Sequence, residues 1–359
     1  MDINDFERPA DRGGFREYNG GSWENFTLGD EKRARGRFSR FFLAAALYII
    51  ISNIVMIGIS VLIELTPLKN NAFFESAEFL VLANVISMYL IAFPIFYLLT
   101  FKMRSATRYK SKMSVKEFAM LFLVGYALMM AGSLVGTLFS DLLGTFLGRE
   151  LVDGTSELIN EMPIWLTVAV PVLIGPVIEE LMYRKILMDK LGTYGDRLAI
   201  TVSAVAFGLF HGNIHQFFYA TLLGFVLGYI YAKTSNILYP IIMHSLINFF
   251  GSVVPLPFIK YVNEYVELSE KIAAGETVDL AVFERAELIS SIYSIIMFSL
   301  VAAGVFILSK YRRKFFISDR CEIEIPKKKR ASVIALNVGT ILFIVVTLAL
   351  VVLDIAVTA

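Results

Sequence analysis

The residues of this sequence that could do chemistry fall into three short motifs. In chain order they are Glu179-Glu180-x-x-x-Arg184, Phe207-x-x-x-His211 and His244-x-x-x-Asn248. All three histidines of the chain lie in the same stretch, and each motif lies in a run of apolar residues or at its end. Ionisable side chains cost several kcal/mol inside a membrane unless they are paired or wet, so they are functional candidates by default. Carboxylate, imidazole and amide groups of this kind can hydrolyse a bond with an activated water.

Helical spacing assigns these residues to different faces. Glu180 and Arg184 stand at i and i+4, so they share a face and are expected to form an ion pair. Glu179 points about 100° away around the helix and is left free for another role. His244 and Asn248 also stand at i and i+4, so both can aim at one point in the interior of a bundle.

Each of these groups has a possible role in hydrolysis. A partly desolvated Glu179 is a candidate general base that takes a proton from water. His211 could share that water or pass the proton to the leaving amine. His244 and Asn248 could form an oxyanion hole, where the loss of one donor typically costs on the order of 10² to 10³ in rate.

A metal site is the alternative for the same side chains. His211, His215, His244 and Glu179 offer the nitrogen and oxygen ligands that suit zinc. However, the sequence has no His-Glu-x-x-His pairing, and Gly212-Asn213 is expected to end the helix that would align the first two histidines. The metal site therefore ranks second, and the leading prediction has no metal and no cofactor. The role of His215 stays open.

The elements that must position these groups are membrane helices. Of the 359 residues, 57% are hydrophobic and 18% are charged, which is too apolar for an ordinary soluble domain. A helix needs about 20 apolar residues to cross a bilayer. The predicted fold is therefore all-α, a polytopic membrane bundle of about nine transmembrane helices, of which the fifth is short. The nine apolar runs are 41–64, 77–101, 118–141, 163–185, 198–212, 216–233, 237–255, 289–309 and 332–356.

The distribution of charge sets the predicted orientation. Lys and Arg crowd the segments 32–40, 102–116 and 310–330, and the cytoplasmic loops of membrane proteins carry such an excess. The alternate loops 149–161 and 257–287 carry more acids than bases, so they are expected to face outward. The N-terminus is therefore predicted to be cytoplasmic, and an odd number of spans puts the C-terminus outside.

The sequence divides into five regions around the motifs. Residues 161–255 hold all three motifs and form the predicted catalytic core. Its first helix contains Pro171 and Pro176, which tend to kink a helix and could open a wet cavity beside Glu179. In segment 256–288 apolar residues recur on one helix face, which predicts either an amphipathic helix on the outer membrane surface or a solvated two-helix hairpin. The other regions are a cytoplasmic tail predicted to be disordered (1–40), N-terminal transmembrane helices (41–160), and C-terminal transmembrane helices with a basic cytoplasmic loop (289–359).

In this order, the three motifs resemble those of the CAAX-protease and bacteriocin-processing family (CPBP, or Abi) of intramembrane proteases, which includes the type II CAAX prenyl endopeptidases. The stretch 233–240 also looks like the family's usual approach to the third motif. The resemblance implies an all-helical bundle and a glutamate-dependent endopeptidase without metal. Glu179 and His211 would then activate water, while His244 and Asn248 stabilise the oxyanion. The residues that would support the site are Glu180, Arg184 and Phe207.

The leading hypothesis is a bacterial plasma-membrane endopeptidase that cleaves membrane-associated peptides, prenylated or of the bacteriocin type. Its partners would be a peptide or protein substrate and the lipid bilayer, and no nucleic acid. Two other classes of protein stay open. One is an ion- or proton-coupled transporter that uses Glu179, Glu180 and the histidines as a relay. The other is a catalytically idle scaffold or bacteriocin-immunity protein that binds a membrane partner.

Overall fold

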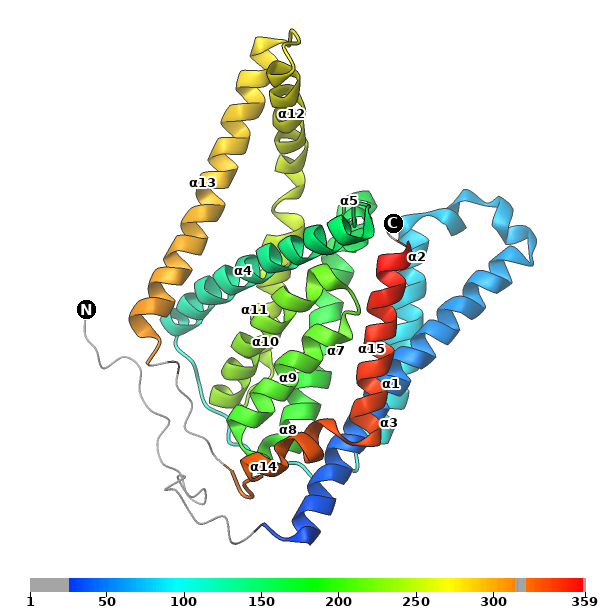
Figure 1. The fold of residues 1–359 in the computed structure, drawn as a ribbon, viewed down its shortest axis with the longest axis vertical. Coiled ribbons are helices and arrows are strands. Elements are labelled where there is room, and N and C mark those ends of the chain that lie inside the picture. Colours follow the sequence, from blue (N-terminus) through cyan, green and yellow to red (C-terminus); the bar gives the residue numbers. More distant parts are fainter. Residues whose placement is uncertain (1–25, 314, 316–320, 358–359) are drawn as a thin grey trace.

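Helices make up the architecture of the chain (Figure 1). The computed structural model describes residues 26–313, 315 and 321–357, and these residues form helices and loops with no strand among them. Eight helical runs within the described residues are long and apolar enough to cross a membrane. The predicted class, an all-α polytopic membrane bundle, is therefore confirmed.

The eight candidate spans include several runs in which consecutive helices join end to end. They are α1 (Leu28–Glu64); α2 (Ala77–Asn84) with η5 (Val85–Ala92) and α3 (Phe93–Thr100); α4 (Val115–Leu147); α6 (Ile164–Thr167) with η6 (Val168–Ile174), α7 (Gly175–Glu180), η7 (Leu181–Met188), α8 (Asp189–Leu191) and η8 (Gly192–Tyr194); α10 (Ile214–Thr234); α11 (Leu238–Asn248) with η9 (Phe249–Val253) and α12 (Leu256–Ala273); α13 (Leu280–Tyr311); and α15 (Val338–Val357). The shorter connecting elements are η3 (Pro67–Asn70), η4 (Ala72–Glu75), α5 (Gly154–Glu161), α14 (Lys327–Arg330) and η10 (Ala331–Ala335).

The fifth predicted span differs from the other eight. It corresponds to α9 (Asp196–Phe210), which has 15 residues. At 1.5 Å per residue such a helix is about 22 Å long, less than the hydrocarbon thickness of about 30 Å. The prediction of nine spans thus becomes eight full-length candidates and one shorter helix that packs in the middle of the bundle (Figure 1).

The charged segments lie at opposite ends of the molecule. The start of α1, the end of α8 and α14 lie at one end, and α5, the tip of the α12–α13 hairpin and the C-terminus lie at the other (Figure 1). The start of α1 and α14 are rich in Lys and Arg, whereas α5 and the hairpin carry more acids than bases. This separation agrees with the predicted orientation, in which the basic end is cytoplasmic.

The N-terminal segment is more ordered than the sequence predicts. Thr27 and Asp30 form a capping box, with each side chain accepting from the other residue's backbone amide, and α1 starts at Leu28. Residues 28–40, predicted to belong to a disordered tail, are therefore helical. The rest of that prediction, on residues 1–25, lies outside the described residues.

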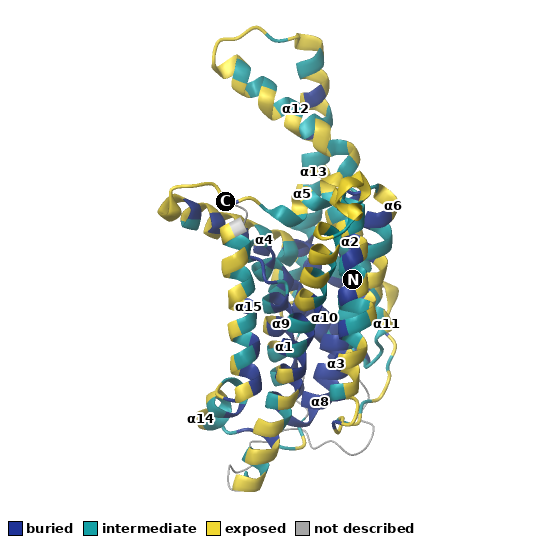
Figure 2. Ribbon diagram, turned by 90° about the vertical axis from the view of Figure 1, so that its right-hand side faces the viewer, coloured by how far each residue is buried: buried dark blue, intermediate teal, exposed yellow. Residues whose placement is uncertain are grey.

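The segment 256–288 forms a helical hairpin that projects beyond the bundle. α12 continues the line of α11, giving a run of 36 residues, about 54 Å at 1.5 Å per residue. α13 returns beside it, with Phe258 stacked on Tyr293 at 5.0 Å between ring centroids. None of the described residues of α12 is buried, and Figure 2 shows the hairpin largely exposed. Of the two structures predicted for this segment, the two-helix hairpin is therefore the one observed, and the helix lying flat on the membrane surface is not.

The buried residues gather around α9 and α10 (Figure 2). One apolar cluster lies on the side of α1, α8, α9 and α15, and a second lies between α4, α10 and α11. Small residues let these helices approach closely, because a Cβ on Gly224 would lie 2.9 Å from Cα of Ala204. Close packing of α10 against both neighbours fixes the positions of the helices that carry the three motifs.

Candidate active site

The first motif lies in a span whose turns are wider than those of an α-helix. η6 precedes α7 and η7 follows it, and both are π-helical. Proline explains part of this, because Pro171 lies inside η6 and Pro176 follows at the start of α7, and neither has an amide hydrogen to donate. Wide turns of this kind frequently occur at functional sites. They place Glu179 and Glu180 at the end of α7, facing the third motif.

Glu180 and Arg184 form the ion pair that their spacing predicts. The distance from Oε1 of Glu180 to Nη1 of Arg184 is 3.0 Å, and both side chains are fully buried. The same Oε1 lies 3.0 Å from Nδ1 of His244, and since an ionised carboxylate can only accept, Nδ1 is the donor. Arg184 also donates to the Gly224 carbonyl at 3.3 Å, and its Cζ lies 4.6 Å from the centroid of the Phe207 ring. The pair therefore links the helices that carry all three motifs.

Glu179 stays outside this ion pair, as the helical spacing predicts. Its Oε2 lies 3.7 Å from Nε2 of His244, which is longer than a hydrogen bond, and its side chain is 19% exposed. Two carboxylates face one guanidinium here, so the cluster carries one net negative charge when its imidazoles are neutral.

Asn248 has a bond that sequence reasoning did not anticipate. Its Nδ2 donates to the backbone carbonyl of Pro171 at 2.8 Å. This carbonyl lacks its usual helical donors. The Gly175 amide donates to the carbonyl of Val170 instead, and Pro176 has no amide hydrogen. Asn248 thus ties the third motif to the wide turn of η6, and its amide keeps a second hydrogen outside this bond.

His211 comes from the C-terminal end of α9, where the chain turns toward α10. Its Nδ1 lies 2.8 Å from the carbonyl of Phe207. A carbonyl oxygen only accepts, so Nδ1 carries the proton and the lone pair of a neutral ring is on Nε2. The Phe207 ring packs edge-on against both His211 and His244, at 4.9 and 5.5 Å between centroids. The second and third motifs therefore meet at Phe207.

His215 does not belong to this cluster. Its Nε2 lies 2.9 Å from Oγ of Ser140 on α4. The four side chains considered as metal ligands, His211, His215, His244 and Glu179, are therefore not brought together as a set. Within the described residues, no group of three or more His, Cys, Asp or Glu side chains is arranged to hold a metal ion.

Tyrosines beside Glu179 are the residues that the sequence did not reveal. Oη of Tyr89 and Oε1 of Glu179 lie 3.3 and 3.7 Å from the point where a Cβ on Gly175 would stand, so they converge over this glycine. The charge of Glu179 also reaches Tyr48. The hydroxyls of Tyr48 and Tyr183 are buried and have no hydrogen-bond partner among the described residues. Buried hydroxyls are normally bonded, so these two are exceptions. A tyrosine in an apolar run has no spacing signal that could have identified it.

The turn that carries His211 is held from two sides. Gly212 has a φ of +61°, and a Cβ on it would lie 2.9 Å from Cβ of Leu350 on α15. Nδ2 of Asn213 donates to Oδ1 of Asp354, also on α15, at 3.4 Å. On the other side, the His215–Ser140 contact ties the start of α10 to α4. Helices from outside the motif region thus position the second motif.

The motif region is similar to known proteins. Residues 161–250 match the family model described as Type II CAAX prenyl endopeptidase Rce1-like. No solved structure matches the chain. The matched residues contain all three motifs, so the resemblance predicted from those motifs is confirmed.

Curated relatives match with similar identity. YdiL of Bacillus subtilis (strain 168), provisionally named a membrane peptidase, is 28% identical over 131 residues, which are 36% of this chain and 54% of YdiL. The UPF0177 protein YxdF of Lactococcus lactis is 28% identical over 99 residues, 27% of this chain and 55% of YxdF. The membrane-embedded CAAX protease MroQ of Staphylococcus aureus (strain USA300) is 28% identical over 177 residues, 45% of this chain and 69% of MroQ. The chain thus spans about half the length of the first two relatives.

Proposed function

We propose that this chain, which carries a domain of the CAAX-protease (CPBP) family over residues 161–250, is an intramembrane endopeptidase. The observation that carries the proposal is the placing of Glu179 opposite Nε2 of His244, beside the buried Glu180–Arg184 pair. A carboxylate without its own cation, next to imidazoles held in defined orientations, suits proton transfer from water. The names of YdiL and MroQ, a peptidase and a protease of the membrane, support the same class of reaction.

In the proposed reaction, Glu179 takes a proton from a water molecule whose oxygen attacks the peptide carbonyl. His211 assists through Nε2, because the Phe207 carbonyl holds its proton on Nδ1. The tetrahedral intermediate then collapses as the C–N bond breaks, and the proton passes to the leaving amine.

Oxyanion stabilisation falls to His244 and Asn248. Asn248 can donate with the amide hydrogen that Pro171 does not use. Nδ1 of His244 already donates to Glu180, so for Nε2 to donate as well the ring must carry both protons. In this scheme Glu180, Arg184 and Phe207 orient His244 and do not touch the substrate.

The proposed substrates are membrane-associated peptides, because the site lies among helices that span the bilayer. Prenylated peptides and bacteriocin-type peptides are the two classes to compare, and the plasma membrane of a bacterium is the proposed location. The purified protein in lipid nanodiscs should be offered the same peptide with and without a farnesyl group. Faster cleavage of the farnesylated peptide would assign the prenylated class, and faster cleavage of the plain peptide would exclude it.

The direct test of the mechanism is Glu179→Gln, which keeps the size of the side chain and removes the base. We expect the rate of peptide cleavage to fall about 10²- to 10⁴-fold, the usual contribution of a general base. Glu161→Gln, on the exposed end of α5, is the matched control and should cleave at the wild-type rate. Undiminished cleavage by Glu179→Gln, in protein that elutes and melts like wild type, would refute the role of Glu179.

The same assay tests the metal-free part of the proposal. We expect 1,10-phenanthroline to leave the rate unchanged and elemental analysis to find no stoichiometric zinc in active protein. Zinc at one equivalent, together with a chelator-dependent loss of activity that added zinc restores, would replace the glutamate mechanism with a metal-assisted one.

A further inference from the structure

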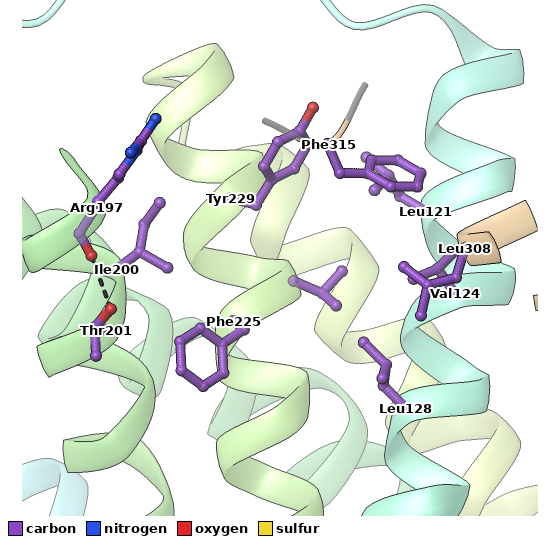
Figure 3. A pocket seen from close by; sticks show the side chains of 11 residues that line it. Leu121, Val124, Leu128, Arg197, Ile200, Thr201, Phe225, Tyr229, Leu308 and Phe315 are labelled. Atoms are coloured by element: carbon purple, nitrogen blue, oxygen red, sulfur yellow. Dashed lines mark hydrogen bonds between the residues drawn. The ribbon is translucent and has the colours of Figure 1, made fainter. Parts of the chain in front are cut away.

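Two parts of the structure have no role in the candidate active site. One is a cavity of about 330 Å³ between α4, α9, α10 and the end of α13 (Figure 3). Its lining is mostly apolar, and such a lining accepts many lipid-like molecules without selecting one. The other is the α12–α13 hairpin, which lies beyond the residues 161–250 that match the family. The hairpin offers both a shape and a charge, so it can select a partner.

One face of α12 carries apolar side chains that stand beside, and not within, its contact with α13. The rings of Phe258 and Tyr265 pack on rings of α13, at 5.0 and 5.6 Å between centroids. Ile259 and Val266 each follow one of these residues, so they point about 100° away around α12. They are 37% and 48% exposed. With Val262 they recur at i, i+3 and i+7, the spacing of one helix face, and we call these three residues the α12 stripe.

The α12 stripe is expected to stand in water. The hairpin projects from the bundle at the end opposite the basic α14 (Figure 1), and none of the described residues of α12 is buried. Ionisable side chains are costly in hydrocarbon, and α12 carries five of them in 18 residues. They are Lys260, Glu264, Glu267, Glu270 and Lys271. An apolar helix face in water, at this spacing, has the form that recognises the apolar face of another helix.

The surroundings of the stripe are acidic. Segment 256–288 has seven acidic and three basic residues, a formal charge of −4. The outer connections 64–78 and 149–161 together have seven acidic and two basic residues, so they add to the same negative field. Within the stripe's own face, Glu270 follows Val266 by four residues. Glu270 is exposed and forms no ion pair with a Lys or Arg among the described residues.

We propose that the α12 stripe binds a cationic amphipathic helix of another polypeptide, which packs along α12 outside the membrane. The apolar side of that helix covers Ile259, Val262 and Val266, and its Lys or Arg side chains lie against Glu270 in the negative field of the hairpin. A second copy of this chain fits less well, because it would bring two hairpins of charge −4 together. An anionic membrane surface is repelled for the same reason.

The proposal concerns binding alone and holds whether or not the candidate site cleaves peptides. α12 continues the line of α11, the helix that carries His244 and Asn248. The partner therefore docks on an extension of a helix of the candidate site.

Fluorescence anisotropy with the full-length protein in phosphatidylcholine nanodiscs tests the proposal. The probe is a labelled peptide of about 14 residues, four helical turns, with Leu at every third or fourth position and Lys elsewhere. One control peptide has the same residues in scrambled order, and another has Glu in place of every Lys. After subtraction of binding to empty nanodiscs, we expect the amphipathic Lys peptide to bind about tenfold more tightly than either control.

Two apolar-to-polar variants test the place of binding. Val266→Ser removes the centre of the stripe and should weaken binding of the Lys peptide about tenfold. Leu288→Ser is the matched control, because Leu288 is 61% exposed on the same hairpin. It lies five residues from both Phe283 and Tyr293, which contact α12, so it points about 140° away from each. Leu288→Ser should leave the affinity unchanged.

Two charge variants test the contribution of the acid. Glu270→Gln should weaken binding of the Lys peptide about threefold, the contribution of one exposed ion pair. Glu75→Gln makes the same change of charge at an exposed position between α1 and α2, outside the hairpin, and should have no effect. All four substituted positions are exposed, so the variants are expected to melt like wild type.

Three results would overturn the proposal. One is binding of the scrambled peptide as tight as that of the amphipathic peptide, which would mean that charge alone attracts it. Another is an equal loss of affinity in Val266→Ser and Leu288→Ser, because any exposed apolar residue would then suffice. The third is a dimer, detected by light scattering in detergent, that Val266→Ser converts to a monomer, since this would assign the stripe to a second copy of the chain.

Discussion

Glu179 and Glu180 are adjacent in the chain and have opposite environments. Glu180 is fully buried and shares one oxygen between Arg184 and His244, so it holds other groups in place. Glu179 is partly exposed, lacks a Lys or Arg partner among the described residues, and faces Nε2 of His244 at 3.7 Å. A rotation of about 100° between successive helical residues produces this difference. The proposed mechanism accordingly gives these two identical side chains different roles, one in chemistry and one in support.

The buried pair leads to a stability prediction at the residue scale. Arg184→Met leaves the carboxylate of Glu180 buried without its cation, which typically destabilises a protein by about 3–5 kcal/mol. Its neighbour Lys185 pairs with Asp189 at 2.8 Å, but its side chain is 52% exposed, so Lys185→Met should cost less than about 1 kcal/mol. Thermal unfolding in one detergent measures both. Equal melting temperatures for the two variants would contradict a structural role of the buried pair.

At the scale of elements, the site depends on helices outside the motif region. α15 and α4 hold the turn between α9 and α10 through Leu350, Asp354 and Ser140. α1 and η5 bring Tyr48 and Tyr89 toward Glu179. The family match over 161–250 includes none of these helices. The candidate site therefore also has neighbours on the flanking spans.

The turn between α9 and α10 gives the corresponding prediction. Gly212→Ala places a residue with a side chain in the left-handed backbone region, which costs about 1–2 kcal/mol. The added Cβ would also collide with Leu350, so we expect the turn to shift and to move His211. We expect lower stability and a lower cleavage rate. Gly148, with a φ of +68° and nothing within 4 Å of an added Cβ, is the matched control. Gly148→Ala should lower the melting temperature through the conformational cost and keep the wild-type cleavage rate. Equal loss of activity in both variants would argue against the positioning role of the α9–α10 turn.

At the scale of the whole molecule, charge divides the protein along its long axis. The basic start of α1 and the basic α14 lie at one end, and the acidic α12–α13 hairpin projects from the other (Figure 1). Lys and Arg near the ends of membrane helices set orientation, because they are retained on the cytoplasmic side. The hairpin extends a span that is longer than the bilayer is thick, so its tip is expected in the aqueous phase, on the side opposite the basic segments.

Cysteine labelling tests this orientation. In a Cys321→Ala background, Ala274→Cys places a thiol at the hairpin tip and Thr107→Cys places one in the basic loop after α3, both at exposed positions. We expect a membrane-impermeant maleimide to label Ala274→Cys in intact cells and Thr107→Cys after lysis alone. The reverse pattern would show that the N-terminus is outside.

The sequence alone determined the properties that depend on local periods. Apolar runs identify helices that cross a membrane, and loop charge separates the two ends. The i, i+4 spacing predicts the Glu180–Arg184 pair and keeps Glu179 out of it. The three motifs also identify the region that matches the family. All of these features are fixed within one helix or one loop, where the chain's own geometry sets the distances.

Contacts between helices were decided by the tertiary structure. Spacing predicted that His244 and Asn248 share a face. Packing decided their partners: His244 bonds Glu180, and Asn248 donates to the backbone carbonyl of Pro171. It separated His215 from the cluster by pairing it with Ser140, and it brought Tyr48 and Tyr89 toward Glu179 from distant spans. A helical period fixes the direction of a side chain from its own axis, whereas its partner depends on how close and at what rotation the next helix packs.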